Sequence, residues 1–277
     1  MGSITIELET PFITPGCPSR ILRTIFELLL YNRKQIPFPY QTFRMMVKNL
    51  NTDDVDASSV ADVQANKQRE KAQHVIHCIE MVLDTIDKIL WNHPASELMI
   101  LFGKTIYTVK EAFIIKLPSV DANHFGENHQ RTLERMLQNI GLQLTLCDEF
   151  GAVQNVQGDT NIFVMLQTTS LEHQVCTKYG MNILDDYQLP RKCATYAINL
   201  QVTAKADDFG HEFPYICCKQ LEIYSEHTEQ SSTSTAIHTT QHKSTDPEVA
   251  VKSRWFLLDA VVSGYSMKSA KHFKIWQ

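Results

Sequence analysis

The pattern of apolar and polar positions near the start of the chain predicts a buried helix followed by an extended segment. Apolar side chains recur through residues 21–30 at a spacing that covers most of a helix circumference. A helix that is apolar nearly all round belongs inside a fold. Pro37 and Pro39 then prevent the helix from continuing, because proline fixes its own φ and moves the preceding residue toward extended backbone. We therefore expect a central helix that ends at the polar residues 31–35 and an extended segment over residues 36–40.

Two later segments show helical periodicity as well. Apolar residues recur at steps of three and four between residues 75 and 90, and Pro94 follows them. Residues 127–146 repeat the pattern, with one apolar face formed by Leu133, Met136, Leu137, Ile140 and Leu144. Before these two helices, residues 51–66 are acidic and poor in apolar side chains, so we expect a loop there. Ser19 stands where it could cap the central helix.

Short apolar or alternating runs predict the strands of a sheet. They occupy residues 98–103, 112–117, 162–166, 196–202, 215–224 and 255–262. Three helices interleaved with strands, and then strands alone, predict an α+β fold. We expect three helices packed on one face of a mainly antiparallel sheet.

One segment departs from this globular pattern. Residues 225–250 are rich in Ser, Thr, Gln, His and Glu and contain almost no large apolar residue, so we expect a disordered insert. The expected organisation is an N-terminal segment (1–18), a body (19–224), the insert (225–250), and a C-terminal strand and tail (251–277) that completes the same domain.

Composition narrows the class of protein. Of 277 residues, 43% are apolar and 21% charged, which suits one large globular domain. A net charge of −5 argues against a nucleic-acid partner. Seven cysteines without a Cys-x-x-Cys pair favour reduced thiols inside the cell. We see neither a signal peptide in residues 1–7 nor an apolar run that could span a membrane.

The residues give no positive indication of catalysis. Phosphate-binding loops, nucleophile elbows and His-Glu-x-x-His motifs are absent from the sequence. His74 and His77 could offer two metal ligands, but no further pair stands at a matching spacing. We therefore expect a non-enzymatic protein with no metal and no cofactor. Thr10 and Thr14 each precede a proline, as in proline-directed phosphorylation sites, but such dipeptides are common.

One segment resembles a known family. Residues 29–40 read Leu-Leu-Tyr-Asn-Arg-Lys-Gln-Ile-Pro-Phe-Pro-Tyr and resemble the most characteristic segment of the Comet family. These are HORMA-like proteins that bind the mitotic-arrest-deficient checkpoint protein. Weaker similarities follow in the family's order at residues 98–113, 133–137 and 186–191, so the resemblance extends over about residues 20–265.

The resemblance implies a non-catalytic adaptor of the spindle assembly checkpoint. Such a protein has a HORMA-like fold with C-terminal strands like a safety belt. It binds the closed conformer of the mitotic-arrest-deficient HORMA protein and presents it to the pachytene-checkpoint AAA+ ATPase. The ATPase converts the partner to its open form, which silences the checkpoint. The implied location is the nucleus and cytoplasm, and the spindle and kinetochores in mitosis.

The resemblance also implies which residues do this work. The partner-binding face would consist of Asn32, Leu133, Glu134, Leu137, Gln138 and Gly141. The ATPase contact would be Pro190, Arg191 and Lys192. A self-ligand strand formed by Trp255, Phe256, Leu257 and Leu258 would take the place of a bound peptide. The family has an aromatic residue at the position of Leu137 and a glutamine at that of Asn32, and spacing alone leaves open whether Leu137 faces the partner or the core.

Two alternatives remain from the sequence. The chain could be another HORMA-type protein that holds a peptide under a mobile belt, in which case residues 255–262 would leave the peptide groove free. It could instead be a cysteine-dependent enzyme using Cys78 or Cys147, which would need a histidine within hydrogen-bond reach in an open pocket.

Overall fold

A computed structural model describes most of the chain and gives six helices within the described part. The described residues are 2–10, 12–49, 60–93, 95–121, 130–151, 158–168, 173–203 and 253–267. The helices are α1 (Cys17–Asn32), α2 (Tyr40–Asn49), α3 (Val60–Asn92), α4 (Gln130–Leu146), α5 (Asp148–Gly151) and α6 (His173–Tyr179). The strands are β1 (Gly2–Leu8), β2 (Ala95–Gly103), β3 (Val109–Lys116), β4 (Asn161–Thr168), β5 (Met181–Ile183), β6 (Ala194–Val202), β7 (Arg254–Leu258) and β8 (Val262–Ser263).

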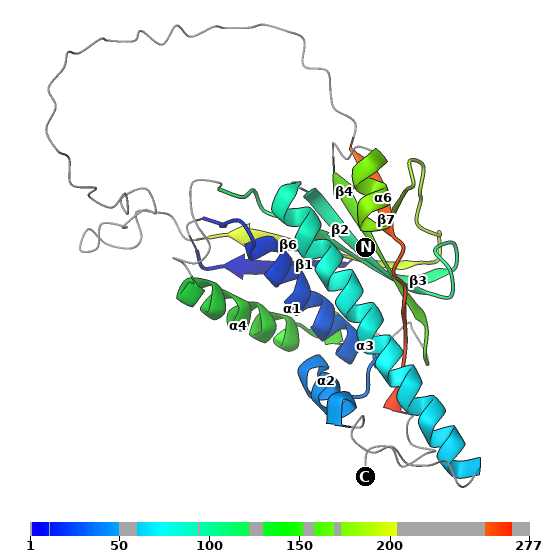
Figure 1. The fold of residues 1–277 in the computed structure, drawn as a ribbon. Helices are drawn as coiled ribbons and strands as arrows, with labels where there is room; N and C mark the ends of the chain where they lie inside the picture. The colour runs from blue at the N-terminus through cyan, green and yellow to red at the C-terminus, as the bar shows by residue number, and fades with distance from the viewer. Residues whose placement is uncertain are drawn as a thin grey trace, which may run out of the picture.

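The strands form one sheet with the order β1-β6-β3-β2-β4-β7-β5. Strand β7 pairs with residues 165–168 of β4, and β8 pairs with residues 161–162 of the same strand. Strand β6 runs parallel to both β1 and β3, and the other pairings are antiparallel. Helices α1, α3 and α4 lie over one face of this sheet, with α1 between the other two (Figure 1). The α+β prediction, with three helices on one face of a mainly antiparallel sheet, is therefore confirmed.

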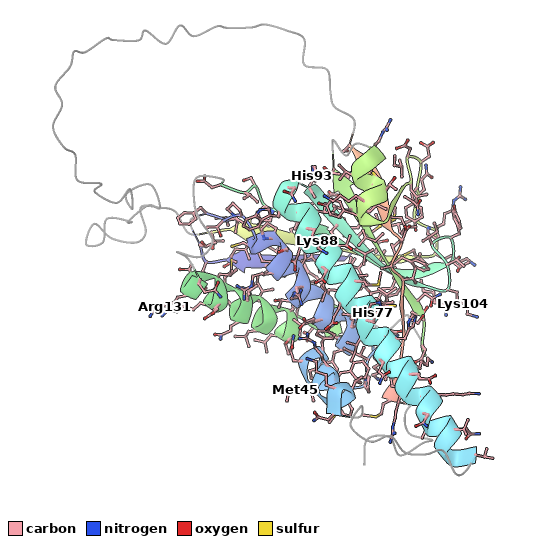
Figure 2. All side chains as sticks on the ribbon, in the orientation of Figure 1. Met45, His77, Lys88, His93, Lys104 and Arg131 are labelled. Atoms are coloured by element: carbon pink, nitrogen blue, oxygen red, sulfur yellow. The ribbon has the colours of Figure 1, made fainter. Side chains whose placement is uncertain are left out.

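Both faces of the central strands are covered, which explains their continuous apolar sequences. On β2, Leu98, Ile100 and Phe102 join the core under the helices. Met99 and Leu101 point to a second cluster on the opposite face, where the segment after β5 packs. The hydroxyl of Tyr187 in that segment donates a hydrogen bond of 2.7 Å to the carbonyl oxygen of Ile106. The outer side of α3 carries polar residues such as His77 and Lys88 (Figure 2).

Several local predictions were wrong. The loop expected over residues 51–66 is too long, because helix α3 begins at Val60. The rest of that prediction, residues 51–59, lies outside the described residues. Helix α2 was missed because only Tyr40, Phe43 and Val47 form its buried stripe. Ser19 does not cap α1. The N-cap is Gly16, with φ of 85°, and the Ser19 hydroxyl donates to the carbonyl oxygen of Gly16.

The C-terminal region confirms a last strand but divides it. Residues 254–258 form β7, and the chain then leaves the ladder before β8. The expected strand at 215–224 and the expected insert at 225–250 lie outside the described residues. Among the helices that the structure describes, none is both long and apolar enough to cross a bilayer.

Candidate protein-interaction site

The turn after α1 is polar in sequence but buried in structure. Lys34 adopts a left-handed backbone with φ of 55°, and the Arg33 side chain that precedes it is buried. The Arg33 guanidinium donates to Glu111 Oε2 at 2.9 Å and to the carbonyl oxygen of Phe150 at 2.7 Å, and it lies 5.0 Å from the centre of the Phe113 ring. Burial raises the pKa of Glu111, although the hydrogen bond from Arg33 opposes this change. The end of α1 is therefore fastened to β3 and α5.

Gln35 fastens the same turn to the C-terminal segment. Its side-chain amide donates to the carbonyl oxygen of Gly158 at 3.1 Å, and its Oε1 accepts from the backbone N–H of Thr160 at 2.9 Å. Its own carbonyl oxygen accepts from the N–H of Tyr265 at 2.6 Å. The buried Tyr265 ring stacks on Phe43 of α2 at 6.1 Å. The residues after β8 are thus held against both the turn and α2.

A groove of about 520 Å³ opens beside this turn, between α1, the start of α2, α4 and α5. Asn32 lies in it and donates from its side-chain amide to the carbonyl oxygen of Phe150 at 3.2 Å. Gly141 of α4 lines the opposite wall, and a Cβ atom added there would meet nothing within 4 Å. The described residues that line it are Thr24, Glu27, Leu28, Tyr31, Asn32, Pro39, Tyr40, Gln41, Gly141, Thr145, Phe150 and Gly151. We call this hollow the α1–α4 groove.

The predicted partner-binding residues differ in how far they are exposed to solvent. Glu134 and Gln138 are exposed on α4, on the flank that continues to Gly141. Leu137 is half-buried and packs against the core, so its side chain serves the fold and reaches the surface only in part. Leu133 is 5% exposed and lies within the core. Asn32 and Gly141 share one groove, whereas Leu133 does not lie on this surface.

The sequence analysis did not identify the aromatic residues and the carboxylate of this groove. Tyr31, Tyr40 and Glu27 are spread over α1 and α2, and their spacing carries no motif. Gln41 would have been equally hard to find, because α2 itself was not predicted. The turn-forming prolines were the available signal, since they bring the start of α2 back toward α1.

The predicted ATPase contact lies on the other face of the sheet. Pro190, Arg191 and Lys192 form a turn closed by the Cys193 N–H, which donates to the carbonyl oxygen of Pro190 at 2.9 Å. Arg191 and Lys192 are exposed. The preceding Leu189 packs on the second apolar cluster, so the two cations are presented from an anchored segment.

The predicted self-ligand residues form β7, which lies between two strands of the sheet. Residues 254–257 pair with Thr168–Met165 of β4, and Phe256–Leu258 pair with β5. Phe256 and Leu258 are buried on the helix side, whereas Trp255 and Leu257 pack on the opposite cluster. An internal strand therefore occupies this edge of β4, which disfavours the alternative of a free peptide groove here. The self-ligand role itself stays a prediction.

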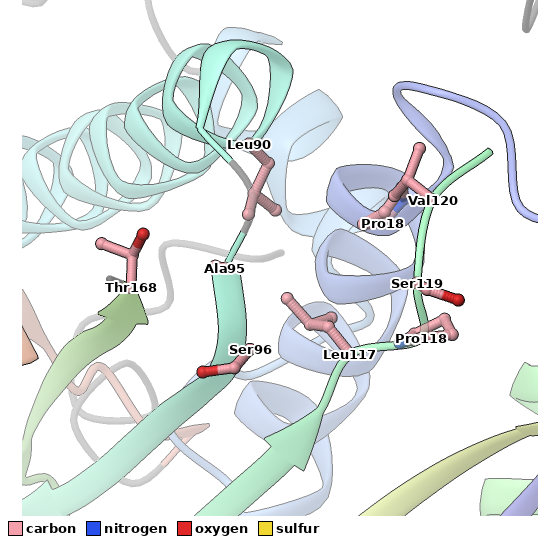
Figure 3. Close-up of a pocket in the computed structure, with 9 residues that line it drawn as sticks. All are labelled: Pro18, Leu90, Ala95, Ser96, Leu117, Pro118, Ser119, Val120 and Thr168. Carbon is pink, nitrogen blue, oxygen red and sulfur yellow. The ribbon is translucent and has the colours of Figure 1, made fainter. Parts of the chain in front are cut away.

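A second hollow of about 370 Å³ lies at the far end of α1 (Figure 3). Pro18, Leu90 and Leu117 supply apolar walls, and Ser96 and Thr168 contribute hydroxyls at one side. None of the described side chains that line it is ionisable. None of the partner-binding, ATPase-contact or self-ligand residues predicted from the sequence lines this hollow.

The cysteine alternative meets one of its two requirements. Cys78 Sγ lies 3.6 Å from His74 Nε2, within reach of a weak hydrogen bond. Cys78 is buried, however, and burial raises the pKa of its thiol, whereas a nucleophilic cysteine needs a lowered pKa. Cys147 is half-buried. Within the described ranges, no three His, Cys, Asp or Glu side chains gather as metal ligands.

The two Thr-Pro sites lie in packed positions. Thr10 is 3% exposed and donates to the carbonyl oxygen of Phe12, and Thr14 is 2% exposed with its hydroxyl 3.0 Å from Cys17 Sγ. A kinase cannot reach either hydroxyl in this folded state.

Comparison with known proteins identifies a family. A family model described as "p31comet: Mad1 and Cdc20-bound-Mad2 binding" matches residues 5–206, which is well over half of the 277 residues. No curated protein matches the chain. The description names binding partners and no reaction, and the matched region includes the turn after α1, the α1–α4 groove and the exposed turn at Arg191. The chain thus belongs to the p31comet family, a HORMA-like family of Mad2-binding adaptors.

Proposed function

We propose that this chain is a non-catalytic adaptor that binds the closed conformer of Mad2 and presents it to the pachytene-checkpoint AAA+ ATPase. Conversion of Mad2 to its open form would then silence the spindle assembly checkpoint. Family membership supports Mad2 binding. The location that we propose for the Mad2-binding face rests on one observation: Asn32 and Gly141, which are distant in sequence, line the same groove.

The physical form of this surface suits a protein partner. The exposed flank of α4 presents Glu134 and Gln138 beside the groove, and Leu137 adds apolar area at the border with the core. In protein–protein interfaces, a few residues that fill a pocket on the partner contribute most of the binding free energy. A helix of the partner that packs along α4 would place side chains into the groove.

The state of the C-terminal segment supports the adaptor over a peptide-binding relative. Strand β7 fills the place next to β4, and Gln35 and Phe43 hold the residues that follow β8. A chain whose own strand completes the sheet resembles a HORMA protein that is already closed. Such a protein would recognise Mad2 by its surface and would need no peptide of its own.

Gly141 offers a direct test of the Mad2-binding face. Gly141→Leu would project a side chain into the groove, whereas Gly141→Ala adds only a Cβ atom that meets nothing. The affinity of each variant for Mad2 locked in its closed or open form is measured by isothermal titration calorimetry. We expect the wild type and Gly141→Ala to bind the closed form selectively, and Gly141→Leu to bind at least about tenfold more weakly, or roughly 1.4 kcal/mol. Equal binding of all three proteins would contradict this location of the face.

The ATPase contact needs a separate test. The exposed turn on the other face of the sheet leaves Arg191 and Lys192 accessible while α4 is occupied. We expect Arg191→Glu combined with Lys192→Glu to retain Mad2 binding and to lose ATPase-dependent conversion of closed Mad2, followed by NMR of labelled Mad2. Conversion at the wild-type rate would assign the ATPase contact to another surface. Action in the nucleus and cytoplasm, and at the spindle and kinetochores in mitosis, is part of the same proposal.

A further inference from the structure

The α1–α4 groove contains a carboxylate that lacks a cationic partner in the described part of the chain. Glu27 accepts hydrogen bonds of 3.3 and 3.4 Å from the side-chain amide of Gln41. The nearby carboxylates are neutralised: Asp87 lies 3.2 Å from Arg23, and Glu80 lies 2.7 Å from Arg44. Burial raises the pKa of Glu27, against the opposing effects of Gln41, Arg23 and Arg44. Among the described residues, Gln41, Arg23 and Arg44 therefore compensate the ionised form of Glu27 only in part.

Tyr40 also lines this groove, and its buried hydroxyl has no hydrogen-bond partner among the described residues. The residue is 3% exposed. Burial, followed by the charge of Glu80, raises its pKa to about 12, so the hydroxyl is neutral at physiological pH. A buried hydroxyl without a partner is costly, and a ligand that reaches it removes that cost.

The walls of the groove suit the stem and the head of a long basic side chain. Leu28, Pro39 and Phe150 supply apolar surface that can pack on methylene groups. Tyr31 is 45% exposed at the groove and offers an aromatic face to a cation. An anion fits less well, because Arg23 and Arg44 are already paired with Asp87 and Glu80.

We propose that the α1–α4 groove binds a basic side chain of the partner protein, with Glu27 as its counter-ion and the Tyr40 hydroxyl as a hydrogen-bond acceptor. The proposal rests on the proposed function, since the same groove contains Asn32 and Gly141. It commits to a cation from the partner as the occupant because the uncompensated charge in the groove is negative. An incoming ammonium or guanidinium group would neutralise Glu27 and could donate a hydrogen bond to the oxygen of the Tyr40 hydroxyl.

The test compares Glu27→Gln with a matched loss of charge elsewhere. Glu27→Gln keeps the shape of the side chain and removes its charge. Asp186→Asn makes the same change of charge at an exposed residue of the segment on the opposite face of the sheet. The dissociation constant for closed Mad2 is measured for the wild type and both variants at low and at physiological salt. We expect Glu27→Gln to bind at least tenfold more weakly and with a smaller salt dependence, and Asp186→Asn to bind as the wild type does.

Thermal unfolding separates this effect from misfolding. Because burial disfavours the ionised form of Glu27, the Gln variant should melt at or above the wild-type temperature at neutral pH. Weak binding by a variant of undiminished stability cannot be attributed to an unfolded chain. Affinity and salt dependence equal to the wild type would overturn the proposal while leaving Mad2 binding intact.

A second measurement decides the case in which the wild type does not bind Mad2. NMR of the free protein with labelled Glu and Tyr is recorded while N-acetyl-arginine amide is added. A shift at Glu27 in the wild type, together with a shift at Tyr40 that vanishes in Glu27→Gln, would support the basic-side-chain site even though the proposed function had failed. No shift at millimolar arginine amide would then overturn the site as well. Analytical sedimentation of the free protein tests whether a second copy of this chain occupies the groove. A dimer that forms in the wild type and is lost in Glu27→Gln would assign the groove to that second copy.

Discussion

The Nε atom of Arg33 lies 2.9 Å from Oε2 of Glu111, and neither side chain is exposed to solvent. Removal of one member of such a pair leaves an uncompensated charge in the core and costs about 3–5 kcal/mol. We expect Arg33→Met and Glu111→Leu each to lower the free energy of unfolding by this amount. The double variant should lose clearly less than the sum of the two, because it leaves no buried charge. Urea unfolding of the four proteins measures the coupling.

An exposed ion pair is the matched control for this cycle. Arg44 and Glu80 approach at 2.7 Å, but their side chains are 42% and 38% exposed. Their cycle should give a coupling of about 1 kcal/mol or less, since solvent screens the two charges. Additive losses at Arg33 and Glu111 would mean that the buried pair does not act as a unit.

Substitution by alanine at two glycines should change the stability of the fold in opposite directions. A Cβ atom at Gly264 would collide with Gln35 Oε1 and lie 2.9 Å from the backbone nitrogen of Thr160. Gly264→Ala should therefore destabilise the fold by about 1–3 kcal/mol. Gly141→Ala fills open space in a helix and should stabilise it by about 1 kcal/mol. Chemical unfolding of both variants checks the signs, and a neutral Gly264→Ala would show that the contact with Gln35 adapts freely.

The sequence predicted those elements whose own residues carry a periodic pattern. Strands β2 and β4 contain continuous apolar runs, and α1 has apolar residues at helical spacing, so their burial could be predicted without knowledge of their neighbours. The sequence predicted a polar end to the helix but not the burial of Arg33 and Gln35, because their partners Glu111 and Thr160 come from segments that only the fold brings near. Burial of a polar side chain depends on such partners, and local spacing does not reveal them.

The residues of the candidate site were likewise only partly predictable from the sequence. The resemblance pointed to Asn32 and Gly141, and the structure places both in one groove. It pointed equally to Leu133, although that residue is buried within the core. Glu27 and Tyr40 escaped notice because a single carboxylate on an apolar helix and a tyrosine after a proline form no motif. Glu27 is half-buried without an ion-pair partner among the described residues, and the Tyr40 hydroxyl is buried without a hydrogen bond; both are properties of the assembled fold.

Hydrogen exchange should show β7 to be a stable strand. Its position between β4 and β5 predicts that the amides of Trp255–Leu258 exchange in the same slow class as those of β4. Gln35→Ala removes the side-chain contacts with Gly158 and Thr160, and the residues that follow β8 should then exchange faster. Mass spectrometry of peptic fragments from both proteins gives the comparison. Fast exchange of β7 in the wild type would instead support a belt that opens to admit a peptide.

The pH dependence of stability should contain a contribution from Glu27. Burial raises the pKa of this carboxyl in the folded protein above its unfolded value, although Gln41, Arg23 and Arg44 oppose the change. Between those two pKa values the folded state binds more protons than the unfolded state, so this contribution to stability falls as pH rises through that window. Glu27→Gln should remove that fall, and Asp186→Asn should retain it. Urea unfolding from pH 4 to pH 7 measures the difference, and parallel profiles for the wild type and Glu27→Gln would show that Glu27 is well solvated and that the groove contains no uncompensated charge.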